Sequence, residues 1–260
     1  MSDALQVQLR DVRAFTGTGR ARVQLAGPVS LTAHAGQLTC MLGPNGSGKT
    51  SVLRAIAGLC EHSGEIVLGE REAHSFGARE RARSLAYVPQ RSLLDAPLPV
   101  ERVVAQGRYA HGGNPETDAH THQALAKVGM AAYAQRPFVD LSLGEQRRVL
   151  IARALATQAK ILLLDEPDAY LDVRERLRLF ELLHTLRGEG HLLLVVVHAL
   201  DEAIRHADRC ILLHGGRVVA DDVPARALDA QNLSAVFGVE LVENGAPAFR
   251  VASRAGSQPR

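Results

Sequence analysis

The sequence has little lysine and little net charge. Only Lys49, Lys127 and Lys160 occur among its 260 residues, arginine supplies the rest of the basic charge, and the formal net charge at pH 7 is +2. A charge this small does not indicate a nucleic-acid-binding protein, and we expect no nucleic-acid partner. Because the arginine bias is typical of a GC-rich genome, the position of the rare Lys49 carries more information than a lysine usually does.

The sequence also indicates neither a disulfide scaffold nor a membrane-spanning segment. The three cysteines, Cys40, Cys60 and Cys210, form no CxxC pair, and a sparse odd set is typical of a reducing cytosol. Residues Met1–Ala4 lack the charged and apolar regions of a signal peptide. No apolar run approaches the roughly 18 residues that a transmembrane helix needs. If the protein acts at a membrane, we expect a partner to hold it there.

Short apolar runs alternate with amphipathic helical patterns, which predicts an α/β fold with a mostly parallel sheet covered on both faces. The predicted strands are Leu5–Leu9, Val29–Thr32, Gln37–Leu42, Gly64–Leu68, Leu85–Val88, Ile161–Leu164 and Leu192–Val197, with a hairpin of Ile211–Leu213 and Arg217–Ala220. The predicted helices are Thr50–Leu59, Val100–Arg108, Thr117–Gly129, Gly144–Ala156 and Val173–Arg187.

The predicted organisation is one domain with an insertion. Residues 91–154 contain helical patterns and few strand signals, which indicates a helical subdomain inserted into residues 1–240. Residues 241–260 are expected to hold a strand and a disordered tail, because Ser253–Arg260 is polar.

A glycine-rich segment between a strand and a helix provides the strongest motif. It fits the phosphate-loop pattern G-x-x-x-x-G-K-[ST], in which glycines let backbone N–H groups point at phosphate oxygens and the helix N-terminus adds its dipole. Lys49 is expected to reach the β- and γ-phosphates, and Thr50 to place its hydroxyl on Mg²⁺. The alternative is a tight surface turn. The predicted ATP contacts are Gly43, Pro44, Asn45, Gly46, Ser47, Gly48, Lys49, Thr50 and Ser51.

A buried strand that ends in two carboxylates is the second motif. Ile161–Leu164 is followed by Asp165, Glu166 and Pro167, at the sheet edge where open α/β proteins bind ligands. We expect Asp165 to hold Mg²⁺ through water and Glu166 to accept a proton from the attacking water. Acidic residues at a helix N-terminus are the alternative reading.

With both motifs in place, the chain resembles the ATP-binding subunit of ABC transporters up to about residue 240. The segment from Leu141 to Arg148, with sequence LSLGEQRR, is similar to the LSGGQ signature. Gln90 matches the Q-loop, the segment from Ala169 to Asp172 matches the D-loop, and His198 matches the switch histidine. The resemblance implies a P-loop NTPase of RecA-like core with an antiparallel β subdomain and a helical subdomain.

The family's mechanism supplies roles for further residues. The resemblance implies ATP and Mg²⁺ as cofactors and a homodimer that sandwiches two ATP molecules. His198 would contact the γ-phosphate, and Gln90 would sense the metal. The residues that would meet the ATP bound to the other copy are Ser142, Gly144, Glu145 and Asp172. Ser142 and Glu145 also fit an ordinary helix capping box, and the two roles are compatible.

Two departures from the family's pattern affect these expectations. Leu143 replaces the first glycine of the signature; it is bulkier and tolerates unusual backbone angles less well. We expect it to weaken packing against the nucleotide of the other copy and so to lower the ATPase activity. The aromatic residue under the adenine ring is not obvious. Phe15 is the nearest candidate, and stacking would contribute about 1–3 kcal/mol, but Thr16–Arg20 makes its spacing loose.

The transporter type rests on the segment from Val100 to His111, which ends in GRYAH. It resembles a motif of importers for iron–siderophore complexes, haem and cobalamin, near where the membrane subunit docks. This implies membrane permease subunits, an indirect solute-binding protein, and a location on the cytoplasmic face of the membrane. Ferric siderophore is the first expected substrate, and haem or cobalamin the second. His111, His120 and His122 are interpreted as part of a solvated loop rather than a metal site.

The sequence thus predicts an ATP-hydrolysing subunit of an importer. Two alternatives stay open: a soluble ABC ATPase without a transport role, for example in cluster assembly, and a regulatory subunit that hydrolyses ATP weakly.

Overall fold

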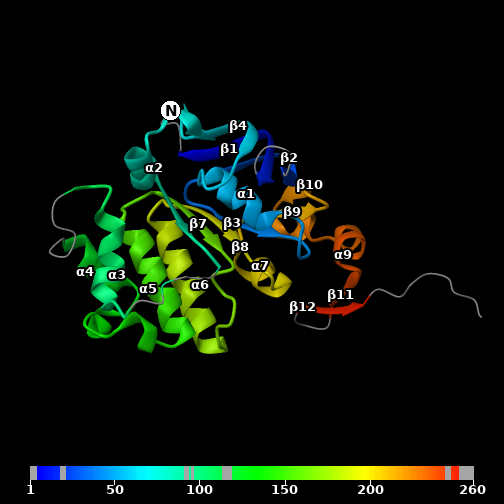
Figure 1. Ribbon diagram of the computed structural model, residues 1–260. Coiled ribbons are helices and arrows are strands. Elements are labelled where there is room, and N and C mark those ends of the chain that lie inside the picture. The colour runs from blue at the N-terminus through cyan, green and yellow to red at the C-terminus, as the bar shows by residue number, and fades with distance from the viewer. Residues whose placement is uncertain are drawn as a thin grey trace, which may run out of the picture.

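The structure is a computed structural model that describes residues 5–17, 22–90, 94, 97–112, 119–243 and 247–251 (Figure 1). Its strands form a six-stranded sheet in the order β10-β9-β3-β8-β7-β6, a four-stranded sheet in the order β2-β1-β4-β5, and a hairpin of β11 and β12. The predicted α/β class, with a separate antiparallel sheet, is confirmed.

The six-stranded sheet forms the centre of the molecule. Strands β6, β7, β8, β3 and β9 run parallel, and only β10 is antiparallel to its neighbour. Every residue of β3, β7 and β8 is buried, as expected for parallel strands covered on both faces. The strands are β3 (Leu38–Leu42), β6 (Leu85–Val88), β7 (Ile161–Asp165), β8 (Leu192–Val196), β9 (Arg209–His214) and β10 (Arg217–Asp222).

The two faces of this sheet belong to two hydrophobic cores. Met41, Leu163 and Leu194 pack with helix α1 (Lys49–Ile56) and the antiparallel sheet. Their neighbours along the strands, such as Leu42 and Leu162, point to the other face and pack with the helices around α5. The sheet is therefore clamped between the antiparallel sheet and the helical part of the chain.

The antiparallel sheet is longer than the sequence predicts. Its strands are β1 (Gln6–Thr16), β2 (Val23–His34), β4 (His62–Leu68) and β5 (Arg71–Glu72). The pairing of β1 shifts register after Leu9, where Asp11 has a φ of 50°. This irregularity breaks the alternation that sequence reading depends on. Pro28 also lies inside β2, and the sheet tolerates it because β2 is an edge strand.

Helices occupy the chain between β6 and β7, and Figure 1 shows them beside α6 on one side of the molecule. The predicted helix Val100–Arg108 is an α-helix that continues as a 3-10 turn. The elements are α3 (Val100–Ala105), the 3-10 turns Gln106–Arg108, Ala131–Tyr133 and Phe138–Asp140, α4 (Ala119–Lys127), α5 (Leu143–Ala156) and, after β7, α6 (Val173–Gly188). Residues 117 and 118 of the predicted helix Thr117–Gly129 lie outside the described residues.

Several short elements were not predicted. They are the 3-10 turn Ala73–Ser75, α2 (Ala78–Ser84), α7 (Leu200–His206), α8 (Pro224–Ala227) and α9 (Ala230–Phe237). Where the sequence predicts one C-terminal strand, β11 (Val239–Glu243) pairs with β12 (Pro247–Val251). The predicted tail Ser253–Arg260 lies outside the described residues. Among the residues described, no helix has the length and apolar character needed to cross a membrane.

Candidate active site

The glycine-rich loop joins β3 to α1, and close contacts explain two of its glycines. Gly43 and Gly48 have φ angles of 147° and 97°, which side chains rarely adopt. A Cβ atom on Gly43 would lie 2.1 Å from the carbonyl oxygen of Leu213, and one on Gly48 would lie 2.6 Å from the Cβ of Ala26. A side chain at Gly43 or Gly48 would collide with these neighbours, so only glycine fits at the two positions. The cavity here has a volume of about 190 Å³ and is lined by Leu25, Asn45, Gly46, Gly48, Lys49, Thr50, Ser51 and Glu166.

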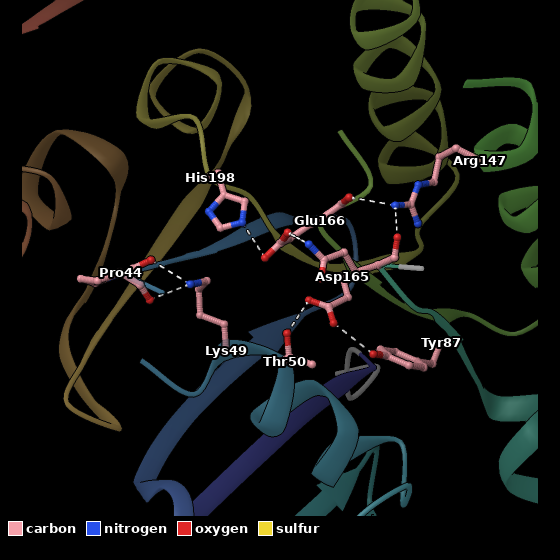
Figure 2. Close-up of polar contacts among 10 residues, drawn as sticks. Pro44, Lys49, Thr50, Tyr87, Arg147, Asp165, Glu166 and His198 are labelled. Atoms are coloured by element: carbon pink, nitrogen blue, oxygen red, sulfur yellow. Dashed lines mark hydrogen bonds and ion pairs between the residues drawn. The ribbon is translucent and has the colours of Figure 1, made fainter. Parts of the chain in front are cut away.

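Lys49 is buried at the start of α1 and is folded back over the loop (Figure 2). Its Nζ donates to the carbonyl oxygens of Gly43 at 2.8 Å and Pro44 at 3.0 Å. An ammonium has three N–H donors, so one stays available for an anionic group in the cavity. Burial lowers the pKa of Lys49, and the nearby carboxylates of Glu166 and Asp165 oppose that shift.

Asp165, at the end of β7, is buried and receives a hydrogen bond on each carboxylate oxygen. Thr50 Oγ1 donates to Oδ1 at 3.0 Å, and the Tyr87 hydroxyl donates to Oδ2 at 3.1 Å (Figure 2). Burial raises the pKa of Asp165, and these two hydrogen bonds oppose the shift. Burial and the neighbouring Asp165 raise the pKa of Tyr87. Tyr87 was not predicted as a site residue.

The Thr50 hydroxyl and the Asp165 carboxylate together fit a magnesium ion. Both are hard oxygen donors, and Mg²⁺ in phosphate sites is held by one or two such groups together with substrate phosphates. Within the part of the chain that the structure describes, no cluster of three or more His, Cys, Asp or Glu side chains could hold a metal by itself. Gln90, also predicted at the metal, forms no hydrogen bond with Thr50 or Asp165, which are both described; its amide donates to Glu166 instead.

Glu166 lies next to Asp165 in a left-handed backbone conformation with a φ of 48°. Such a conformation costs of order 1–3 kcal/mol for a residue with a side chain and is found where the surroundings fix it. Here the Glu166 N–H donates to the carbonyl oxygen of Val196 at 3.1 Å. The buried side chain has a partner on each oxygen, because His198 Nε2 lies 2.6 Å from Oε1 and the Gln90 amide donates to Oε2.

Arg147 links the segment of Gln90 to Glu166, although the sequence analysis predicted no role for it. The buried guanidinium of this α5 residue donates to the carbonyl oxygen of Pro89 at 2.6 Å. It also donates to the carbonyl oxygens of Gln90 at 2.6 Å and of Glu166 at 3.2 Å (Figure 2). Burial lowers its pKa, and the charges of Asp168, Asp165 and Glu166 oppose that shift. The signal in the sequence was an arginine inside the signature-like segment, but its partners depend on how α5 packs.

Residues 26–169 of the chain match the family model described as ABC transporter. The chain belongs to the ATP-binding subunits of ABC transporters. It is therefore an ATP-hydrolysing enzyme of that family, and the P-loop fold with its antiparallel β subdomain is the ABC ATPase fold.

Three relatives of this ABC ATPase show its place in the family. The hemin import ATP-binding protein HmuV of Pseudomonas entomophila is 36% identical over 230 residues, which is 86% of this chain and 90% of the relative. The cobalamin import ATP-binding protein BtuD of Halobacterium salinarum is 35% identical over 236 residues, 87% of this chain and 59% of the relative. The solved dimeric structure of an ATP-binding cassette in a post-hydrolysis state, bound to ADP and Pi, has a TM-score of 0.75 and 26% identity, covering 84% of this chain and 98% of the other.

The signature-like segment of the ABC ATPase forms the start of α5 and does not line the phosphate-loop cavity. Ser142 caps the helix: the Glu145 N–H donates to its hydroxyl at 3.3 Å, and its own N–H donates to Glu145 Oε2 at 2.9 Å. Gly144 lies close to α6, where an added Cβ would be 3.3 Å from Glu175 Cγ. Asp172 caps α6 and accepts from the Glu175 N–H at 2.8 Å. None of Ser142, Gly144, Glu145 and Asp172 lines that cavity.

Leu143 is not strained in this position. It is the first residue of α5, and its φ is not among the positive values found outside glycine in the described residues. Its side chain is 63% exposed. The expected conflict between leucine and the backbone is therefore absent, and the exposed side chain is accessible to another molecule.

Phe15 does not line the phosphate-loop cavity, and another side chain covers one face of its ring. The Arg22 guanidinium carbon lies 3.6 Å from the ring centroid, and Arg22 also pairs with Glu61 at 3.0 Å. The Phe15 N–H donates to the carbonyl oxygen of Glu61 at 2.9 Å. Its role under an adenine ring stays a prediction, and Arg22 would have to move for a base to stack on the face that it covers.

Proposed function

We propose that this ABC ATPase powers the import of a metal chelate of the ferric siderophore, haem or cobalamin class. The observation that supports import is the similarity to relatives named for hemin and cobalamin import, each over more than four fifths of this chain. Both named compounds are macrocyclic metal chelates. In this proposal the subunit is bound to polytopic permease subunits on the cytoplasmic face of the membrane, and a solute-binding protein delivers the substrate on the other side.

Hydrolysis in this proposal depends on Glu166. Its carboxylate accepts a proton from the attacking water, and general-base catalysis of this kind contributes roughly 10²–10⁴ in rate. The contacts with His198 and Gln90 support this role because they hold both oxygens of Glu166 in place. Lys49 binds phosphate oxygens through its remaining N–H. Thr50 and Asp165 hold Mg²⁺, which when bound neutralises charge on the phosphates.

Two copies of the chain would form the working unit. Ser142, Gly144, Glu145 and Asp172 lie outside the phosphate-loop cavity, and the similar solved cassette with ADP and Pi is a dimer. We infer that these residues contact ATP held by the other copy. ATP then makes contacts that exist only in the closed dimer, and this difference is what lets ATP shift the equilibrium towards closure.

Co-purification followed by transport tests the proposal. The tagged chain is expressed in its own host, the polytopic membrane protein that co-purifies is identified, and the complex is reconstituted in liposomes. ATP-dependent uptake is then compared for a ferric hydroxamate siderophore, haem and cobalamin. Uptake of one of the three that is lost in Lys49→Ala supports the proposal. A chain that captures no membrane protein and hydrolyses ATP alone supports the non-transport alternative instead.

A further inference from the structure

A second cavity lies at the opposite end of the central sheet from the phosphate loop. Its volume is about 330 Å³, and it is bordered by α4, by the end of α5 with the turn that follows, and by the residues that precede β7 and β8. Because β7 and β8 are parallel, Asp165 and His198 lie at their other ends, about 17 Å away at 3.3 Å per residue. We call it the α4 cavity; its polar lining residues are His120, Gln123, Lys127, Gln158, Lys160 and His191.

Lysine is concentrated at the α4 cavity. The chain has three lysines, and two of them, Lys127 and Lys160, line it, whereas none of its described lining residues is an arginine. Lys127 pairs with Glu189. Lys160 forms no hydrogen bond or ion pair with any residue that the structure describes, so its three N–H donors are available. The cavity therefore holds one positive charge that no described carboxylate pairs with.

His191 adds a nearly buried ring nitrogen to the α4 cavity. The residue is 8% exposed, and its Nδ1 lies 3.1 Å from the carbonyl oxygen of Leu186. A carbonyl oxygen only accepts, so Nδ1 carries the hydrogen and Nε2 of the neutral ring is an acceptor. Burial lowers the pKa of His191, which favours the neutral ring, although the hydrogen bond to Leu186 opposes the shift. The Glu189 carboxylate is nearest to Nδ1, at 3.9 Å, and Nε2 has no hydrogen-bond partner among the described residues.

Two glutamine amides supply further donors. Gln158 Oε1 accepts from Arg108 Nη1 at 3.1 Å, so the amide nitrogen of Gln158 is the group left to donate. Gln123 lines the cavity from α4. An ammonium and amides from separate segments suit a tetrahedral anion, whereas a planar carboxylate is matched best by the fork of an arginine. The donor set of the α4 cavity is therefore that of a phosphate site.

We infer that the α4 cavity binds a phosphate group, as inorganic phosphate or as the phosphate of a small soluble metabolite. Lys160 supplies the charge, and the amides of Gln123 and Gln158 donate to phosphate oxygens. His191 Nε2 accepts the hydrogen of a protonated phosphate oxygen. The volume of about 330 Å³ lies within the range of small-molecule sites. This site is separate from the ATP site and does not depend on which substrate is transported.

The acceptor nitrogen of His191 makes the site selective between two similar anions. A phosphate monoester has a second pKa of about 6, so part of it carries a proton near pH 7. Sulfate carries none at that pH and leaves Nε2 without a donor. Phosphate should therefore bind more tightly than sulfate, although both are tetrahedral and negatively charged.

Calorimetry on the full chain at pH 7 tests the site, with Mg²⁺ and a non-hydrolysable ATP analogue filling the phosphate loop. The probes are inorganic phosphate, glycerol 3-phosphate and sulfate. Lys160→Gln removes the unpaired charge and should weaken phosphate binding about tenfold, the usual effect of losing one charged hydrogen bond. Arg79→Gln is the matched control, because it removes one positive charge from an exposed residue of α2 that does not line the cavity.

Saturable binding of both phosphate probes, tighter than that of sulfate and weakened by Lys160→Gln but not by Arg79→Gln, supports the inference. In the same titration followed by NMR, the ring signals of His191 should shift, while those of His74, whose side chain is 77% exposed, should not. The inference is overturned if phosphate does not bind, binds no more tightly than sulfate, binds equally to Lys160→Gln, or leaves the His191 signals unchanged. An equal loss in Arg79→Gln, or binding to phosphatidic acid vesicles without binding of glycerol 3-phosphate, is likewise contrary.

Discussion

The replacement Arg147→Met would remove the link between the Gln90 segment and Glu166. Arg147 is buried, and its guanidinium bonds to three carbonyl oxygens, those of Pro89, Gln90 and Glu166. Methionine fills a similar space but donates no hydrogen bond. The carbonyl oxygens would lose their donor, and the left-handed backbone at Glu166 would lose one of its restraints.

The expected effect on stability is large. A hydrogen bond that involves a charged group contributes about 1.5–3 kcal/mol. The three bonds do not add in full, because they share one side chain whose burial already lowers its pKa. We therefore expect Arg147→Met to lower the free energy of unfolding by about 3–5 kcal/mol, because each buried carbonyl oxygen left without its donor costs about 1–3 kcal/mol and the three costs do not add in full. A displaced Glu166 should also reduce kcat by up to about a hundredfold.

Urea unfolding and steady-state ATPase assays at low temperature measure the two effects. Arg10→Met is the control, because Arg10 pairs with Glu65 at the surface at 2.9 Å and such pairs contribute about 0–1 kcal/mol. Arg147→Lys tests geometry, since a lysine keeps the charge but lacks the planar fork of donors. The reasoning is refuted if Arg147→Met is no less stable than Arg10→Met and keeps wild-type kcat.

Three further predictions follow from single side chains. Burial raises the pKa of Asp165, so the ionised carboxylate costs stability at neutral pH. Asp165→Asn should therefore raise the melting temperature near pH 7 while abolishing hydrolysis. This gain in melting temperature should disappear as the pH falls towards 3.8, the ordinary pKa of an aspartate. Gly107→Ala should cost about 1–3 kcal/mol in urea unfolding, because the new Cβ would lie 2.3 Å from the Arg153 carbonyl oxygen, whereas Gly188→Ala, with open space around it, should be neutral or stabilising. Leu143→Gly should raise ATPase activity only at protein concentrations where dimers form; a rise in dilute monomer would contradict the unstrained helical backbone seen at this residue.

The phosphate loop and the buried strands could be predicted because their signals are local. Gly43 to Thr50 carries its own backbone requirements, and strands such as Ile161–Leu164 are apolar throughout because both faces are covered. The predicted strands of the antiparallel sheet were too short, because strands of this kind are recognised by the alternation of apolar and polar residues. The irregular pairing near Asp11 interrupts that alternation although the strand continues to Thr16.

The missed site residues depend on contacts between distant segments. Tyr87 reaches Asp165 because β6 and β7 pair in parallel with Tyr87 opposite Leu163, a register that no local pattern contains. Arg147 was visible inside the signature-like segment, but its partners Pro89 and Gln90 lie on the other side of the helical insertion in the sequence.

The central claim is that Glu166 is the general base of a dimeric ATPase. The most direct measurement is magnesium-dependent phosphate release by wild type and Glu166→Gln over a range of protein concentrations. We expect wild-type activity to rise more steeply than in proportion to protein concentration, and Glu166→Gln to lose roughly 10²-fold or more of it while still binding ATP. Phosphate release by Glu166→Gln at close to the wild-type rate would contradict it.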